Sequence, residues 1–148
     1  MIALIQRVKA ARVKINGKTI SKISKGYLIL LGILEDDSKE DARKLAKKIA
    51  FLRIMSDKNG KMNRDIKESG GEILVVSQFT LAADLSRGRR PSFVKAKNPK
   101  QAKELYEFFV QELKNYQIPV KTGRFGEYMQ VYLQNDGPVT IIADSKKL

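Results

Sequence analysis

The first 23 residues restrict the fold more than any other part of the chain. Residues 2–15 are rich in apolar and β-branched side chains, which favour a strand. Asn16 and Gly17 follow, and this pair is typical of the two-residue turn that closes a β-hairpin. Residues 19–23 supply the return strand. The chain is therefore expected to begin with a hairpin and to build its fold on a sheet.

Two later segments are nearly free of polar residues. Residues 27–34 form one apolar run after Gly26, and residues 72–77 contain another after Gly70 and Gly71. Such runs are typical of strands that are buried on both faces. Three further strands are expected over residues 120–122, 129–134 and 139–143.

Two amphipathic helices are indicated between the strands. Ser38 begins the first, and Asp41 three residues later completes a capping box. Asn98 and Pro99 begin the second, as cap and first helical residue. The apolar residues of both recur at helical spacing: Ala42, Leu45, Ala46, Ile49 and Leu52 in the first, and Ala102, Leu105, Tyr106, Phe109 and Leu113 in the second.

These elements predict a single compact α+β domain over residues 1–148, with two main helices and a largely antiparallel sheet. Antiparallel pairing is expected because hairpin-like connections dominate the pattern. The chain contains no Gly-rich dinucleotide-binding loop and no P-loop. A hydrophobic content of 43% is sufficient for one core, and no linker or repeat divides the chain.

The amino-acid composition excludes several kinds of chemistry. The chain has no cysteine, so disulfides and cysteine nucleophiles are excluded. It has no histidine either, which removes the commonest general base near neutral pH and the commonest metal ligand. A zinc site would have to use carboxylates alone. We therefore expect no metal and no cofactor, and any hydrolysis must proceed without a Ser-His pair.

The net charge of +13, from 29 basic and 16 acidic residues, points to a polyanionic partner. Such a surplus attracts nucleic acid and raises encounter rates with it, although a basic protein without any nucleic-acid role has the same composition. No apolar run reaches the 18 or so residues that a transmembrane helix needs, so no membrane partner is expected. Residues 1–14 alternate in polarity, which argues against a signal peptide and favours the cytoplasm.

Two polar segments are candidates for a functional site. Ser77, Gln78, Phe79 and Thr80 follow a buried strand, where active sites are common, but the segment holds no base that could activate a hydroxyl. Hydroxyls at a strand end also bond nearby backbone routinely. The second segment contains Arg87, Arg89 and Arg90, which suit phosphate binding or form a solvated loop.

Two glycine-containing segments lie near the end of the chain. Gly123 and Gly126 form a GxxG pattern, but the RNA clamp of that pattern joins two helices, whereas strands are expected on both sides here. Residues 135–140 (NDGPVT) have the composition of a turn between two strands. A cis bond before Pro138 is uncommon by base rate, at about 5–6% of X-Pro bonds.

Taken in order, these motifs resemble the D-aminoacyl-tRNA deacylase family over nearly the whole chain. The matching segments are residues 1–8 (MIALIQRV), 77–84 (SQFTLAAD), 90–93 (RPSF), 122–126 (TGRFG) and 135–140 (NDGPVT). The resemblance implies a homodimer that hydrolyses the ester between a D-amino acid and the terminal adenosine of tRNA. It also implies that Gly137 and Pro138 form a Gly-cisPro motif that enters the active site of the partner subunit.

The resemblance implies a role for several residues. Ser77, Gln78, Phe79 and Thr80 would line the pocket, and the Gly-cisPro backbone would bind the ammonium group and reject L-residues by steric clash. Such a filter should admit glycyl-tRNA, because glycine has no side chain to reject. The remaining candidate substrate-binding residues are Arg7, which would anchor the Gly-Pro loop or be a solvated charge, Arg90, Phe125, and Met129, which is equally a core residue.

Two mechanisms are compatible with these residues. In the first, the free ribose hydroxyl of the terminal adenosine assists water, and backbone N–H groups near Phe79 and Thr80 stabilise the oxyanion. In the second, Thr80 attacks and forms an acyl-enzyme; the first is favoured because a hydroxyl nucleophile normally needs a partner base. Two other functions are considered: a non-catalytic RNA-binding module, which the charge and the arginine cluster support equally well, and a hydrolase of another small ester, for which the basic charge would be incidental.

Overall fold

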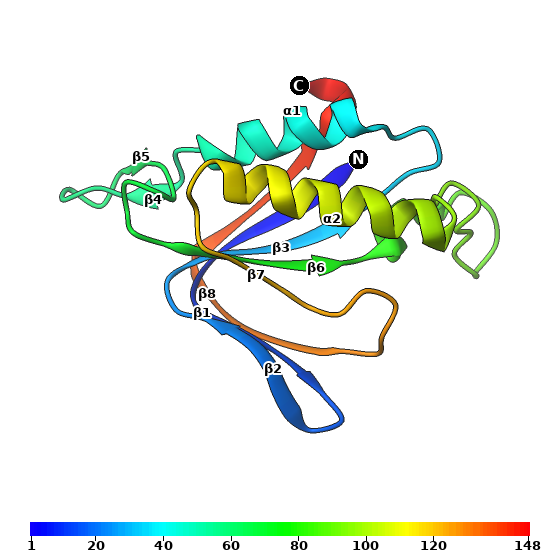
Figure 1. Cartoon of the computed structure of the whole chain (residues 1–148), viewed down its shortest axis with the longest axis horizontal. Coiled ribbons are helices and arrows are strands. Elements are labelled where there is room, and N and C mark those ends of the chain that lie inside the picture. Colours follow the sequence, from blue (N-terminus) through cyan, green and yellow to red (C-terminus); the bar gives the residue numbers. More distant parts are fainter.

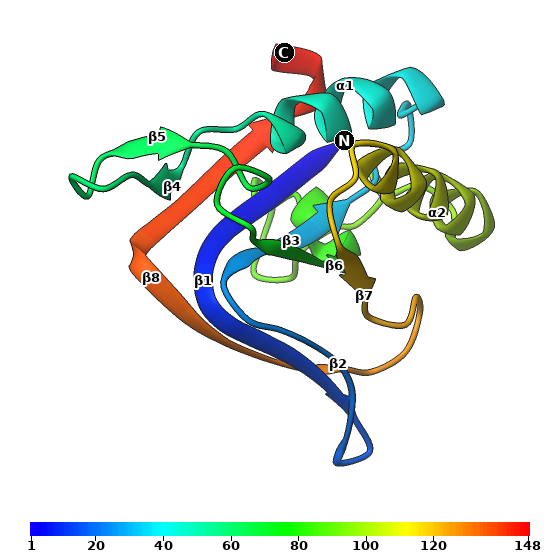
Figure 2. The same ribbon diagram turned by 60° about the vertical axis from the view of Figure 1, so that its left-hand side comes forward.

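The computed structural model describes residues 1–148, and β1 (Ile2–Ile15) is its central strand. β1 pairs antiparallel with β2 (Lys18–Ile23) along its C-terminal part and with β3 (Gly26–Gly32) along its N-terminal part. β8 (Gln130–Asp144) follows nearly the whole of β1, also antiparallel, and therefore occupies its other edge. The hairpin between β1 and β2 is confirmed. Figure 2 shows β1 strongly curved, with β8 bending beside it.

The other side of the sheet differs from the sequence prediction. β6 (Glu72–Ser77) pairs parallel with β3, and β7 (Val120–Thr122) pairs parallel with β6. The sheet is therefore mixed, with three antiparallel and two parallel pairings. The prediction of a largely antiparallel sheet is wrong in this half because each connection there passes through a helix. A helical crossover returns the chain in its original direction.

The two helices begin where the sequence indicates. α1 (Lys39–Ala50) connects β3 to β6, and the backbone N–H of Ser38 donates to the Asp41 carboxylate at 2.9 Å. α2 (Pro99–Asn115) connects β6 to β7, and the side chain of Asn98 accepts from the N–H of Gln101 at 3.1 Å. Both helices cover the same face of the sheet (Figure 1). Neither is long and apolar enough to span a membrane.

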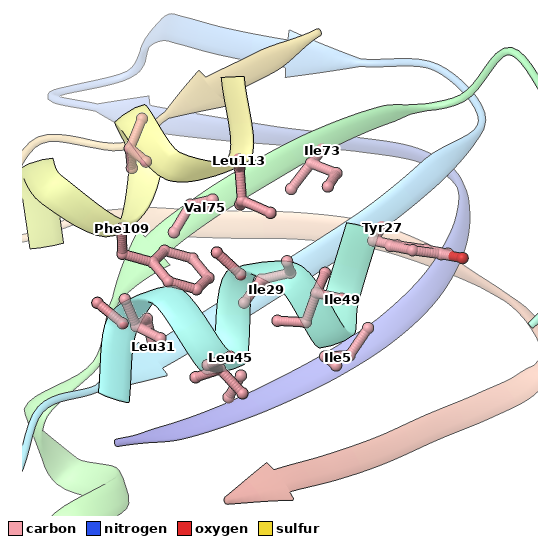
Figure 3. Packing of buried hydrophobic residues seen from close by; sticks show 14 of the residues in the cluster. Ile5, Tyr27, Ile29, Leu31, Leu45, Ile49, Ile73, Val75, Phe109 and Leu113 are labelled. Atoms are coloured by element: carbon pink, nitrogen blue, oxygen red, sulfur yellow. The ribbon is translucent and has the colours of Figure 1, made fainter. Parts of the chain in front are cut away.

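The main core lies between the helices and the sheet. Leu45 and Ile49 of α1 and Phe109 and Leu113 of α2 pack towards the sheet in Figure 3. The sheet contributes a set of alternating side chains, namely Ile5, Tyr27, Ile29, Leu31, Ile73 and Val75. A second cluster on the other face contains Leu28, Leu74 and Val76. β3 and β6 are thus buried on both faces, which explains their continuous apolar runs.

Three short elements complete the chain. β4 (Met55–Ser56) and β5 (Met62–Arg64) form a small separate hairpin after α1. A 3-10 helix, η1 (Phe79–Ala82), follows β6, and a second, η2 (Ser145–Lys147), follows β8. Because η1 begins two residues after β6 ends, it lies where the two parallel strands β3 and β6 both terminate.

Candidate active site

A pocket opens at the C-terminal ends of the parallel strands β3 and β6, the usual position of ligand sites in parallel sheets. Its volume is about 690 Å³, and 11 of its 18 lining residues are hydrophobic. Leu31 and Val76 form part of its wall, and the first turn of α2 contributes Pro99 and Ala102. The cavity is thus an apolar recess with polar groups at one end, as small-molecule sites usually are.

Some of the polar groups come from residues 77–80, and others are Lys97, Asn98 and Glu127. Ser77 and Gln78 line the pocket, and Phe79 lines it from the start of η1. Thr80 is the next residue, is exposed, and accepts a hydrogen bond on its Oγ1 from the Gln78 amide. No carboxylate or amine bonds to the hydroxyl of Ser77 or Thr80 in the structure. Neither hydroxyl therefore has a base that would make it a nucleophile.

The backbone at the start of η1 has free donors. A 3-10 helix leaves its first N–H groups without a partner in the helix. The N–H groups of Phe79 and Thr80 form no hydrogen bond, whereas that of Leu81 donates to the Gln78 carbonyl at 3.2 Å. Two adjacent free N–H groups therefore lie beside the pocket, where they can bind a negatively charged oxygen.

The opposite wall of the pocket comes from the connection between β7 and β8. Phe125 and Met129 both line the cavity. The N–H of Arg124 donates to the Met129 sulfur at 3.4 Å, and a Cβ on Gly123 would lie 2.6 Å from that sulfur. The glycine thus makes room for the Met129 side chain, which also packs against the second core cluster.

One titratable group lies directly behind the pocket. Tyr106 packs against Phe125 with ring centroids 5.7 Å apart, and its hydroxyl donates to the Val75 carbonyl at 2.8 Å. Burial, and to a lesser degree Glu107, raises the pKa of Tyr106. The phenol therefore stays protonated near neutral pH and acts as a structural donor rather than as a base.

Five candidate residues do not line this pocket: Thr80, which follows Phe79 at its edge, and Arg7, Arg90, Gly137 and Pro138. Gly137 and Pro138 belong to a protrusion of β8, residues 136–139, which we call the β8 protrusion. Gln6 of β1 pairs with Thr140 of β8, and Val8 pairs with Asn135. Only Arg7 lies between these pairs on β1, whereas residues 136–139 lie between them on β8 and therefore bulge out.

The turn expected over residues 135–140 is therefore not a turn between two separate strands. Pairing with β1 resumes on the far side, and β8 is one strand from Gln130 to Asp144. The Asn135 side chain closes the bulge, since its Oδ1 accepts from the N–H of Val139 at 2.8 Å and its Nδ2 donates to the Val139 carbonyl at 3.1 Å.

The β8 protrusion requires glycine at one position. Gly137 has a φ of +151°, and a Cβ there would lie 2.7 Å from the Val139 backbone nitrogen. Any larger residue would have to move the backbone. The following Gly137–Pro138 peptide bond is cis.

Arg7 holds the protrusion from the inside. It is 9% exposed, so it is a buried cation rather than a solvated one. Its Nε donates to the Asp136 carbonyl at 2.8 Å, and its Nη1 donates to the Ile54 carbonyl at 2.8 Å and to Ser56 Oγ at 3.2 Å. The guanidinium therefore ties the residue before Gly137 to the start of β4.

Comparison with known proteins identifies the family of this chain. The family model described as D-Tyr-tRNA(Tyr) deacylase matches residues 4–144. A D-aminoacyl-tRNA deacylase of Thermosipho africanus is 55% identical over 148 residues, covering 100% of this chain and 99% of the relative. One of Haemophilus influenzae is 56% identical over 140 residues, covering 95% and 96%. The chain belongs to the D-aminoacyl-tRNA deacylase family.

Solved structures show the same fold in two relatives. The c-Myc DNA unwinding element binding protein superposes with a TM-score of 0.91 at 39% identity, covering 97% of this chain and 98% of the other. A probable eukaryotic D-amino acid tRNA deacylase superposes with a TM-score of 0.85 at 16% identity, with the same coverage. At that identity the second match shows the fold alone.

Sequence reasoning missed some residues of the site in this member of the deacylase family. Phe93 and Tyr128 line the pocket, and Tyr128 is 90% exposed at its edge. Asn135 closes the β8 protrusion through two hydrogen bonds with Val139, but the sequence indicated only a turn residue at this position. The composition of residues 135–140 indicated a local turn. The hydrogen bonds of Asn135 depend instead on the bulge that forms where β8 pairs with β1.

Replacing Arg7 should destabilise the protein. Arg7→Ala leaves the buried carbonyl of Ile54 and the part-buried carbonyl of Asp136 without this donor, and an unsatisfied buried group costs about 1–3 kcal/mol. Urea unfolding measures the loss. Lys9→Ala is the matched control, because Lys9 also faces Asp136, at 4.0 Å, but is 63% exposed. That control should change stability by no more than about 0.5 kcal/mol, and equal losses in the two variants would contradict the anchoring role.

Proposed function

We propose that this chain hydrolyses the ester bond of D-aminoacyl-tRNA, releasing free tRNA and the D-amino acid. Support comes from the pocket at the end of β6, which combines an apolar recess with the free N–H groups of Phe79 and Thr80 in a chain that matches deacylases along its whole length. The net charge of +13 suits a tRNA substrate. We also propose a cytoplasmic location, because aminoacyl-tRNA is made and used there.

The chemistry proposed is attack by water rather than by a side chain. Water adds to the ester carbonyl carbon, the bond to the ribose oxygen breaks, and that oxygen leaves with a proton. The neighbouring free ribose hydroxyl orients or activates the water, because neither Ser77 nor Thr80 has a base. The N–H groups of Phe79 and Thr80 bind the oxyanion that develops.

The proposed chirality filter is the backbone of the β8 protrusion from a second copy of the chain. The protrusion contributes nothing to the pocket of its own subunit, yet Arg7 and Asn135 hold it in a fixed shape. Its carbonyl oxygens would bind the substrate ammonium group, and its backbone would clash with an L side chain. Glycyl-tRNA would pass this filter.

The edge of the sheet supports a homodimer. β8 has 15 residues and none of them is buried in the single chain. Its exposed apolar residues include Leu133, at 38%, and Ile142, at 70%. A long edge strand with exposed apolar side chains is prone to associate with another chain. A two-fold dimer would bring each protrusion to an equivalent place on its partner.

Hydrolysis of matched D-tyrosyl-tRNA and L-tyrosyl-tRNA by the purified protein tests the function directly. We expect rapid loss of the D-ester and survival of the L-ester, with glycyl-tRNA also cleaved. Release of the labelled amino acid gives the rates. If tRNA is bound while both esters survive, the chain is a non-catalytic RNA-binding module. Cleavage of both esters would retain the hydrolase and refute the backbone filter.

Two substitutions separate the mechanisms. A tRNA ending in 2′-deoxyadenosine and esterified at the 3′ position should be cleaved about 100-fold more slowly or worse, because it lacks the assisting hydroxyl. Thr80→Ala should keep substantial activity on normal D-tyrosyl-tRNA in single-turnover assays, since Thr80 then contributes its N–H alone. Loss of activity in Thr80→Ala, together with full-speed cleavage of the deoxy substrate by the wild-type protein, would favour an acyl-enzyme instead.

Mixing experiments test the shared site. Gly137→Ala distorts the protrusion, because its Cβ would meet the Val139 backbone, and Phe79→Ala removes a pocket residue that is 58% exposed. Each variant alone should be nearly inactive, whereas refolding the two together should restore activity, since half of each mixed dimer then joins an intact pocket to an intact protrusion. The control is a chain with both substitutions, which should inactivate wild-type subunits on mixing. Failure to restore activity would contradict the cross-subunit arrangement.

A further inference from the structure

A loop rich in arginine projects beside the mouth of the pocket. It comprises residues 85–91, which we call the arginine loop, and it contains Arg87, Arg89 and Arg90. Its ends are joined by an antiparallel bridge in which the N–H of Asp84 donates to the Ser92 carbonyl at 2.8 Å and the reverse bond measures 3.0 Å. The loop is therefore closed at its base, and its exposed tip extends from that base.

The base of the loop is attached to the pocket. Phe93 follows the bridge, lines the pocket, and packs edge-on against Phe79 with ring centroids 5.0 Å apart. Arg90 is three residues from Phe93, so their Cα atoms are separated by no more than about 11 Å. A chain of nucleotides leaving the pocket on this side would pass the guanidinium groups.

The carboxylate at the base of the loop, Asp84, is already bonded to other groups. Asp84 accepts from the N–H of Ser86 at 2.9 Å and forms an ion pair with Lys95 at 3.3 Å. Hydrogen bonds from Ser86, together with Lys95, lower the pKa of Asp84 to about 2, so the carboxylate is ionised. Its charge is paired with Lys95 and bonded to Ser86 at the base of the loop.

The three arginines of the loop have no partner of their own. All three are exposed, and none forms an ion pair or a side-chain hydrogen bond. Arg43, Arg53 and Arg124 are exposed too, but each of them bonds to a neighbouring side chain. Arg64 is also exposed and without such a bond, but it stands alone in β5 and does not line the pocket. Free guanidinium groups bind phosphate in a bidentate manner, and they do so without regard to base sequence.

We infer that the arginine loop binds the phosphate backbone of the nucleotides that precede the terminal adenosine held in the pocket. The inference rests on the proposed function, because it takes the nucleic acid strand to end at that site. It assigns the loop a contribution to tRNA affinity that is independent of the attached amino acid. Because arginine displaces counterions from phosphate, these contacts should also make the affinity for tRNA depend on salt concentration.

A pair of triple variants tests the inference. Arg87→Ala/Arg89→Ala/Arg90→Ala removes three charges from the loop, and Lys44→Ala/Lys47→Ala/Lys48→Ala removes the same charge from the exposed side of α1. Each protein is assayed on D-tyrosyl-tRNA and on D-tyrosyl-adenosine, an ester without phosphates. Urea unfolding confirms that both variants are folded.

The loop variant should lower the ratio of kcat/KM for the tRNA ester to kcat/KM for the adenosine ester by about tenfold or more at 0.15 M salt, through KM. The slope of log kcat/KM for tRNA against log salt should fall in magnitude by about 2–3, at roughly 0.7–0.9 per phosphate contact. The α1 variant should keep a ratio close to that of the wild type. An unchanged ratio in the loop variant, or an equal change in both variants, would overturn the inference.

Binding of uncharged tRNA separates this inference from the proposed function. If the wild-type protein cleaves neither ester, the proposed function is wrong, and the loop is judged by affinity alone. Weaker tRNA binding by the loop variant than by the α1 variant would then support the phosphate contacts. Equal affinities would refute them.

Discussion

The structure depends on the pairing of β1 along both of its edges. One edge carries β3, and through it the parallel strands β6 and β7 whose ends form the pocket. The other edge carries β8, which holds the β8 protrusion. The pocket and the protrusion are therefore fixed to opposite edges of one strand. This arrangement gives a physical reason why the protrusion is absent from the pocket of its own chain, and why the site proposed here draws on two chains.

Local sequence signals predicted the elements that are determined locally. Asn16 and Gly17 both adopt a positive φ in the first hairpin, as their pair predicts. Each helix starts where a nearby side chain accepts from a free backbone N–H: Asp41 accepts from Ser38, and Asn98 accepts from Gln101. The continuous apolar runs marked β3 and β6 as doubly buried. None of these signals depends on residues far along the chain.

The features that were not predicted from the sequence depend on contacts between residues far apart in the chain. The parallel pairing of β3 with β6 follows from where α1 packs, and no short pattern encodes that. The composition of residues 135–140 correctly indicated a departure from regular strand. It could not indicate that β8 resumes pairing with the same neighbour, because that depends on β1 and on the Arg7 side chain. The pocket likewise joins Ser77 to Phe125 and Met129, which are distant in sequence and were grouped only through the family resemblance.

The anchoring of the β8 protrusion by Arg7 has a consequence for molecular association. The groups that hold the protrusion all belong to its own chain: Arg7 and Asn135 bond to it directly, and Ile54 holds Arg7 in place. The protrusion is thus ordered during folding, before any molecule docks against it. A surface that is ordered in advance loses little conformational entropy on binding, so more of the contact energy appears as affinity. Recognition at this point should accordingly resemble the meeting of two rigid bodies, with small backbone movement on either side.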